Sequence, residues 1–133
     1  MSTETVNTPH VTLSFTASAA LRDSFQRVLV DLIALELVGK QAHWNIVNAT
    51  PDGRPATVAA SATVPVAPEG EVLTTDAVAY IVSAIEAVVA TLRDVHDTID
   101  GEDPSSSGII EDLTVQLEQQ AWFLSSEIRK PVR

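Results

Sequence analysis

Apolar side chains recur every three or four positions along three long stretches of this 133-residue chain. The first stretch places five of them on one helical face: Leu21, Phe25, Val28, Leu32 and Leu35. Ser18 stands just before this stretch, and serine readily caps the first turn of a helix. The pattern therefore predicts a helix over about residues 18–46, preceded by an aperiodic N-terminal arm over residues 1–17.

The second stretch has the longest apolar stripe, which keeps to one face through roughly six turns. Its members are Val78, Ile81, Val82, Ile85, Val88, Val89, Leu92, Val95 and Ile99. Thr74 or Thr75 is the expected cap at its start, and Gly101 is the expected end. This stripe predicts a helix over about residues 74–100.

The third stretch begins at Asp103 and Pro104, a capping residue followed by proline at the first helical position. Its apolar stripe consists of Ile110, Leu113, Leu117, Ala121, Leu124 and Ile128. Pro131 is the expected stop, because proline cannot continue a helix. We therefore expect a helix over about residues 104–130.

Between the first two helices, residues 48–73 are rich in proline and glycine, which interrupt regular structure. A connection of this length is unusual in a compact domain. The expected fold is all-α, with one domain over residues 18–130. It is an antiparallel bundle of three long helices with a long irregular loop.

The net charge of −10 argues against a general nucleic-acid surface, which needs clustered Lys and Arg. The C-terminus is the exception, because Arg129, Lys130 and Arg133 form a short basic end. These three cations would hold DNA weakly and in a salt-sensitive way. The simpler interpretation is that they complement the dipole of the last helix.

Other features of the sequence favour a soluble, cytoplasmic chain with no membrane partner. The chain has no cysteine, which excludes disulfides and thiolate metal sites. It shows no uninterrupted apolar run of 18 residues and no basic-then-apolar secretory signal at its start. Nucleophile elbows and phosphate-binding glycine loops are also missing from the sequence.

Four stretches of the chain, taken in order, resemble the Dps family, the bacterial miniferritins. They are Asp31–Val47 with its His-Trp-Asn motif, Pro51–Pro65, Thr74–Asp103 and Leu117–Arg129. The resemblance implies a ferritin-like helix bundle that assembles into a dodecameric cage. It also implies iron binding and storage, oxidation of ferrous iron by peroxide, protection from oxidative stress and protection of DNA.

One family element is missing from this sequence. Only Ile-Val-Asn-Ala-Thr separates Asn45 from Pro51, where the family has its second helix. The missing piece is on the order of thirty residues, or about 45 Å if wholly helical. In the family it carries a second histidine and an Asp and Glu pair that complete the iron site. Pro55, Gly70 and Thr74 fall at the corresponding spacings from His43 and cannot replace those ligands.

By resemblance, His43 is the surviving iron ligand, at a site that the family shares between two subunits. A single histidine cannot hold iron usefully, because such a site needs several nitrogen and carboxylate ligands. If the resemblance is set aside, the sequence alone favours a packing or capping role for His43. Trp44 resembles the tryptophan beside the family site, and its alternative role is a large interface anchor.

Two further groups have both a chemical and a structural interpretation. His96 and Asp100 are four residues apart and could form half of a weak metal site. We favour a solvated charged face there, with Asp94 and Asp97, because no second helix offers an obvious matching pair. Asp103 matches a residue near the iron-entry pore of Dps cages, and its structural alternative is helix capping.

Two functional classes follow. One is a Dps-like iron-storage and ferroxidase protein whose iron site is incomplete in this chain, so that ligands come from full-length subunits in a mixed cage. The other is a non-catalytic truncated interaction subunit. Both imply self-association, because a bundle that lacks one of four helices leaves apolar faces uncovered.

Overall fold

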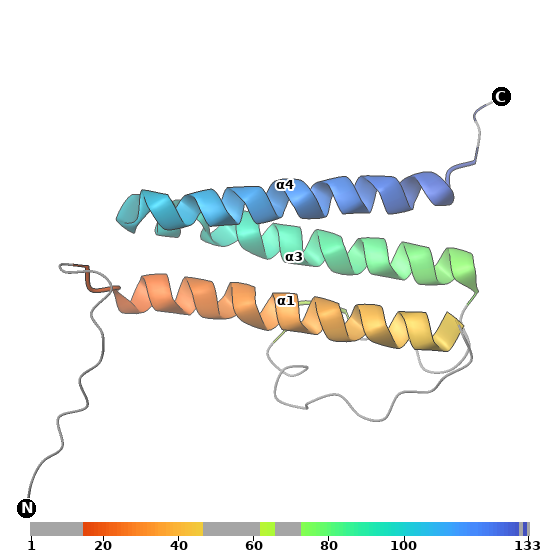
Figure 1. The fold of residues 1–133 in the computed structure, drawn as a ribbon, viewed down its shortest axis with the longest axis horizontal. Helices are drawn as coiled ribbons and strands as arrows, with labels where there is room; N and C mark the ends of the chain where they lie inside the picture. The colour runs from red at the N-terminus through yellow and green to blue at the C-terminus, as the bar shows by residue number, and fades with distance from the viewer. Residues whose placement is uncertain (1–14, 47–61, 66–72, 131, 133) are drawn as a thin grey trace, which may run out of the picture.

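The computed structural model describes residues 15–46, 62–65, 73–130 and 132. These contain three long helices, α1 (Ala19–Ile46), α3 (Thr74–Glu102) and α4 (Pro104–Glu127), as Figure 1 shows. The described part of the chain has no β-strand. The prediction of an all-α fold is therefore confirmed.

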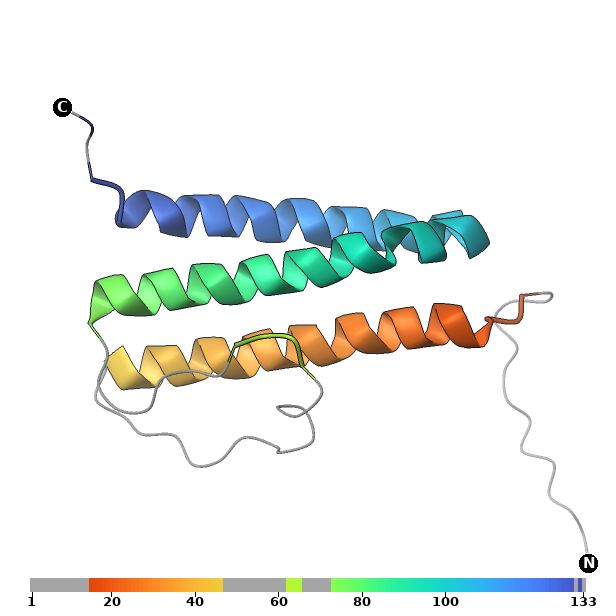
Figure 2. The same cartoon turned by 180° about the vertical axis from the view of Figure 1, so that it is seen from behind.

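The central element is α3, which packs against both α1 and α4. Among the described residues the backbones of α1 and α4 do not approach each other closely, and Figures 1 and 2 show these helices on opposite sides of α3. Both outer helices run antiparallel to α3 (Figure 1). The three helices thus form an open layer, which suits the wide apolar stripe of α3 because it covers two neighbours at once.

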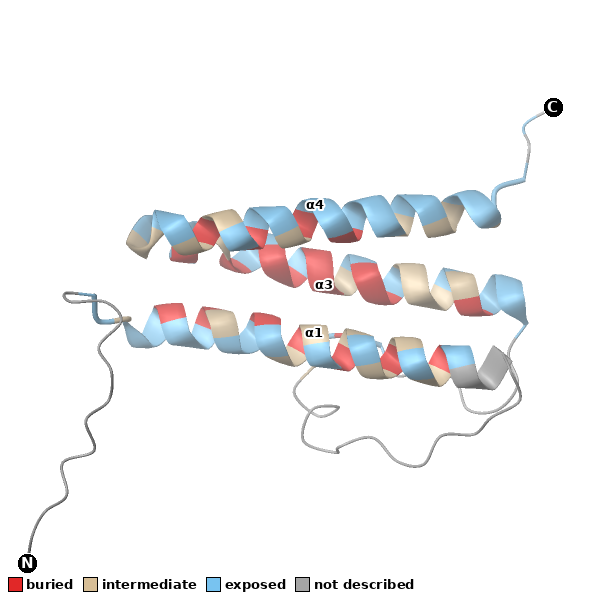
Figure 3. Cartoon of the chain, viewed as in Figure 1, coloured by how far each residue is buried: buried red, intermediate tan, exposed pale blue. Residues whose placement is uncertain are grey.

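The core follows the expected stripes. Its largest fully buried apolar side chains are Val38 from α1, Val88, Leu92, Val95 and Ile99 from α3, and Ile110 from α4. Figure 3 shows the buried residues concentrated on α3 and on the sides of α1 and α4 that face it. Burying each such side chain contributes about 1.5–3 kcal/mol relative to exposure, so packing against α3 is the main stabilising term.

The start of α3 agrees with the prediction, whereas its expected capping residue and its expected end at Gly101 were wrong. The helix begins at Thr74, and the extended residue before it, Leu73, is the N-cap without a side-chain bond. The Leu73 carbonyl instead accepts a hydrogen bond from the Ala77 N–H at 2.9 Å. Gly101 lies inside the helix, because the Asp103 N–H still donates to the Ile99 carbonyl at 2.7 Å. The turn into α4 therefore begins after Glu102.

The expected start of α1 is confirmed and the expected end of α4 is not. Ser18 Oγ accepts a hydrogen bond from the Leu21 N–H at 3.1 Å, so Ser18 caps α1. Helix α4 ends at Glu127, about three residues earlier than expected, with Ile128 as its C-cap. Pro131 disfavours helical backbone at the residue before it, so the helix unwinds ahead of the proline.

Of the expected loop over residues 48–73, the structure describes residues 62–65 and Leu73. These residues lie outside any helix, and Val64 is buried in the core. Of the expected arm, residues 15–17 are described and are not helical. The rest of both segments lies outside the described residues.

By length and composition alone, α3 could also cross a membrane, with a mean hydropathy of 1.6 over an 18-residue window. In this fold 39% of that window is buried. The buried core helix of a soluble protein has the same composition, so the resemblance to a membrane span is weak.

Candidate functional site

His43 lies on the exposed side of α1, near its C-terminal end. It continues a row of exposed residues with helical spacing, formed by Leu29, Ile33, Glu36 and Lys40. We call this row, including His43, the outer row of α1. His43 makes no hydrogen bond or ion pair with the described residues. Its imidazole is therefore accessible to a ligand or a partner.

The remaining part of the motif is only partly described. Trp44 lies in α1, but its side chain lies outside the described residues. One turn before His43, the Lys40 ammonium pairs with the Glu36 carboxylate at 2.8 Å. This hydrogen bond, together with the positive charge, lowers the pKa of Glu36.

Asp103 is the N-cap residue of α4 and is half-buried in the turn between α3 and α4. Its carbonyl accepts hydrogen bonds from the N–H groups of Ser106, at 3.0 Å, and Ser107, at 3.2 Å. Its carboxylate accepts a hydrogen bond from the Ser106 hydroxyl and accepts none from a backbone N–H of the helix. These contacts support a role in the turn.

Arg129 and Lys130 are exposed beyond the end of α4, where they are free to meet a polyanion or the dipole of the helix. Arg133, the third member of the basic end, lies outside the described residues. The described tail therefore offers two accessible cations.

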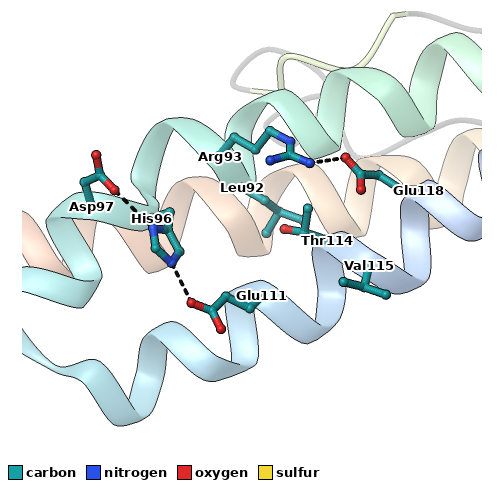
Figure 4. A pocket seen from close by; sticks show the side chains of 8 residues that line it. All are labelled: Leu92, Arg93, His96, Asp97, Glu111, Thr114, Val115 and Glu118. Atoms are coloured by element: carbon teal, nitrogen blue, oxygen red, sulfur yellow. Dashed lines mark hydrogen bonds and ion pairs between the residues drawn. The ribbon is translucent and has the colours of Figure 1, made fainter.

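His96 lies between carboxylates from two helices, as Figure 4 shows. Its Nε2 is 2.9 Å from Oε1 of Glu111 on α4, and its Nδ1 is 3.1 Å from Oδ1 of Asp97 on α3. The carboxylate of Asp100 accepts the Ser107 hydroxyl at 2.7 Å. Glu111 of α4 is therefore a partner of His96 across the two helices that the spacing along α3 did not reveal.

Other charges on α3 also pair across helices. Asp94 contacts Arg27 of α1 at 2.8 Å, and Arg93 binds Glu118 of α4. Arg93 and Asp94 are adjacent, so they point to different sides of α3, and helical spacing does not show which helix lies opposite each of them. These charged side chains are exposed to solvent and also form ion pairs between helices.

The carboxylates around His96 change its acidity. A hydrogen bond with Glu111 is the largest cause of a raised His96 pKa, followed by the bond with Asp97 and by the negative charges of Glu111 and Asp100. A groove of about 380 Å³ opens beside these residues, with Leu92 and Thr114 also in its wall (Figure 4). The arrangement can hold a proton between α3 and α4.

A buried carboxylate that the sequence analysis did not single out lies in the core of α1. Asp31 is 2% exposed. It accepts hydrogen bonds from the Thr63 N–H at 2.8 Å, from the Thr63 hydroxyl and from the Thr91 hydroxyl at 2.6 Å. It thus joins α1, α3 and the 62–65 segment. The available signal was a lone Asp near the apolar stripe, which does not reveal its partners.

The described residues contain no group of three or more His, Asp or Glu side chains that could hold a metal ion. His43 and His96 lie on different helices, and each of the carboxylates near His96 already has a hydrogen-bonding partner. Within one chain, the described side chains therefore do not match the ligand set that ferrous iron requires.

A scan against protein-family models gives no match for this chain. A search of curated proteins likewise finds no similar sequence.

Proposed function

We propose that this chain is a Dps-like, ferritin-like subunit that takes part in iron binding and storage. In this proposal ferrous iron is oxidised at a site that His43 shares with another subunit. The four ordered stretches that resemble the family, together with the all-α fold, support the proposal. The iron is the substrate, and oxidative-stress protection is the expected outcome of removing it with peroxide.

The observation that carries the proposal is the position of His43. An iron ligand shared between subunits must face outward, and His43 lies on the exposed outer row of α1. The same row exposes Leu29 at 52% and Ile33 at 36%. Apolar side chains beside an accessible imidazole suit an interface that also holds a metal.

The ligand set supports assembly as a condition for activity. One imidazole cannot fix an iron ion, whereas a second subunit could add nitrogen and carboxylate ligands at the same place. Those ligands would come from full-length subunits in a mixed cage or from another copy of this chain. We therefore infer that monomers of this chain do not oxidise iron.

The test is ferrous iron oxidation by peroxide, followed by absorbance on purified, size-fractionated protein. The proposal expects an assembled fraction to exceed the protein-free rate and His43→Ala to return it to that rate. His96→Gln is the matched control and should keep the activity. A protein-free rate in every fraction, or a rate that depends on His96 instead, would contradict the proposal.

The second candidate is a non-catalytic interaction subunit, and one specific observation favours it. The described residues contain no group of three metal-binding side chains, while large apolar side chains are exposed on both α1 and α4. If the chain self-associates but does not oxidise ferrous iron, the non-catalytic interaction subunit is the supported function.

DNA binding and location are further parts of the proposal. Arg129 and Lys130 are exposed, which supports weak and salt-sensitive contact with phosphates. Deleting residues 129–133 should then abolish any retardation of DNA in a gel, and equal mobility would remove this role. Zero cysteines fit a reducing cytoplasm.

A further inference from the structure

The outward side of α4 exposes two large apolar side chains that the core does not use. Val115 is 64% exposed and Trp122 is 60% exposed. They are seven residues apart, so they lie on one side of the helix about two turns from each other. The Trp122 ring meets Phe123 edge-on at a centroid distance of 5.2 Å. Exposed tryptophan of this kind is enriched where proteins meet.

The charges along α4 are unevenly distributed. Glu111, Asp112 and Glu118 lie in its first two thirds, Glu127 is its last residue, and α4 contains no Lys or Arg. Arg129 and Lys130 follow directly after its end. Asp112, Arg129 and Lys130 are exposed and form no ion pair with the described residues.

Arg129 lies on the same side of the molecule as Trp122. Both line a groove of about 550 Å³ between α3 and α4, together with Val89, Ala121 and Ser125. The wall of this groove also contains Glu86 and the paired Arg93 and Glu118, so Trp122 and Arg129 share a surface with charged groups of both signs.

We propose that this surface binds a second copy of the chain, with the two α4 helices packed antiparallel about a two-fold axis. The antiparallel direction sets the acidic part of each α4 against the C-terminal end of the other, where the two cations Arg129 and Lys130 outnumber the one acid, Glu127. A parallel pair would set acid against acid. Because the axis is two-fold, each favourable contact occurs twice.

The charges also define a register, and the register brings the tryptophans together. Pairing Glu111 with the other copy's Arg129 centres the axis on residue 120, and pairing Asp112 with Lys130 centres it on 121. Trp122 lies within two residues of either centre, or about 3 Å along the helix. The two Trp122 rings are then neighbours, so the charge pattern and the apolar pattern select the same arrangement.

Ion pairs at the edge and aromatic side chains at the centre have separate roles in this interface. The aromatic contact removes apolar surface from water and supplies most of the affinity. The rim charges orient the copies and offset part of the repulsion between two chains of net charge −10. The interface does not involve His43 and does not depend on the proposed iron function.

The experiment is sedimentation velocity over a range of protein concentrations at low salt. The wild type should show a monomer and dimer equilibrium that salt weakens. Trp122→Gln should weaken dimerisation by about tenfold or more, as loss of a central aromatic side chain usually does. Ile109→Gln is the matched control, because Ile109 is 57% exposed on a different side of α4, and it should leave the equilibrium unchanged.

A charge swap tests the direction of packing independently of Trp122. Asp112→Lys and Lys130→Asp should each weaken the dimer, and the double variant should regain most of the lost affinity. Circular dichroism checks that every variant stays helical. A monomer at all concentrations, a double variant no better than the single ones, or charge effects confined to DNA retardation would overturn the proposal.

Discussion

Asp31 shows how one buried side chain can organise three segments. Its carboxylate is 2% exposed and accepts two hydroxyl groups and one backbone N–H, from Thr63 and Thr91. A charge in the core is tolerated only when such partners replace water. The cluster therefore holds the 62–65 segment, including buried Val64, against α1 and α3.

Replacing Asp31 with Ala should destabilise the fold by about 2–4 kcal/mol, because it leaves a buried N–H and two hydroxyls without their acceptor. Urea unfolding followed by circular dichroism measures the loss. Asp23→Ala, at an exposed position of the same helix, should change stability by less than about 0.5 kcal/mol. Equal stability of the two variants would show that the cluster does not stabilise the fold.

His96 gives stability a pH dependence of known sign. The pKa of His96 is raised in the folded chain by Glu111 and Asp97, so folding favours its protonated form. Its contribution is fully present below about pH 6.5, the unfolded value, and is lost as the pH rises through the folded pKa. The neutral ring has one N–H and can donate to only one of the two carboxylates.

Unfolding by urea at pH 6.0 and pH 8.5 should therefore show a fall in stability that His96→Gln reduces. His43→Gln should keep the full difference, because His43 has no such partners among the described residues. An NMR titration of the His96 ring gives the pKa directly. A value at or below 6.5, or an unchanged pH dependence in His96→Gln, would exclude this account.

At the residue scale the sequence identifies candidates but not their partners. The spacing of His96 and Asp100 places them on one face of a helix, yet His96 bonds to Glu111 and Asp97, and Asp100 bonds to Ser107. Which side chain lies opposite depends on the rotation and offset of α4 relative to α3. Periodicity within one helix carries no information about either quantity.

At the element scale, the start of α1 is tied to the end of α3. The Ser18 N–H donates to Glu102 Oε1 at 2.8 Å, the Ser18 hydroxyl donates to the other oxygen, and Ser18 Oγ caps Leu21. Ser18 thus serves as a cap and as a link between two antiparallel helices.

Ser18→Ala should cost about 1–2 kcal/mol, because it removes a helix cap together with one hydrogen bond to Glu102. Thermal unfolding compares it with Ser105→Ala, an exposed position in the first turn of α4 that should have little effect. Ser18→Asn, which preserves capping but not the hydroxyl link, should lie between the two. If Ser18→Ala lowered the stability of the fold no more than Ser105→Ala does, a capping role of Ser18 would be ruled out.

The helices themselves were predictable because each has a stripe long enough to exceed chance. The ends of the helices were less predictable, since capping depends on backbone geometry as well as on residue type. Thr74 is a good capping residue, yet extended Leu73 occupies the cap position. Gly101 is a common helix end, but here α3 continues through it to Glu102.

At the scale of the whole molecule, the open layer explains why association is expected. α3 lies between α1 and α4, whose backbones do not approach each other closely among the described residues. Each outer helix therefore keeps a side without a neighbour in the described part of the chain. Leu29 and Ile33 on α1, and Val115 and Trp122 on α4, lie exposed there.

The sequence indicated three antiparallel helices but not the order in which they pack. Three amphipathic helices can close into a triangle or lie as a layer, and their stripes are compatible with both. The wide stripe of α3, with Ile99, Leu92 and Val88 fully buried, is what permits it to lie between two neighbours. The loop composition predicted irregular structure, while the contact of Thr63 with Asp31 required the fold.

The central claim is that this chain acts as part of an assembly, since both the shared site of His43 and the surface of α4 require a second subunit. Light scattering on the purified protein across a range of concentrations tests it most directly. We predict a discrete species whose mass is a fixed multiple of the 14.2 kDa chain. The fraction of the protein in this species should increase as the concentration rises. A 14.2 kDa monomer at every concentration, or only polydisperse aggregate, would contradict the account.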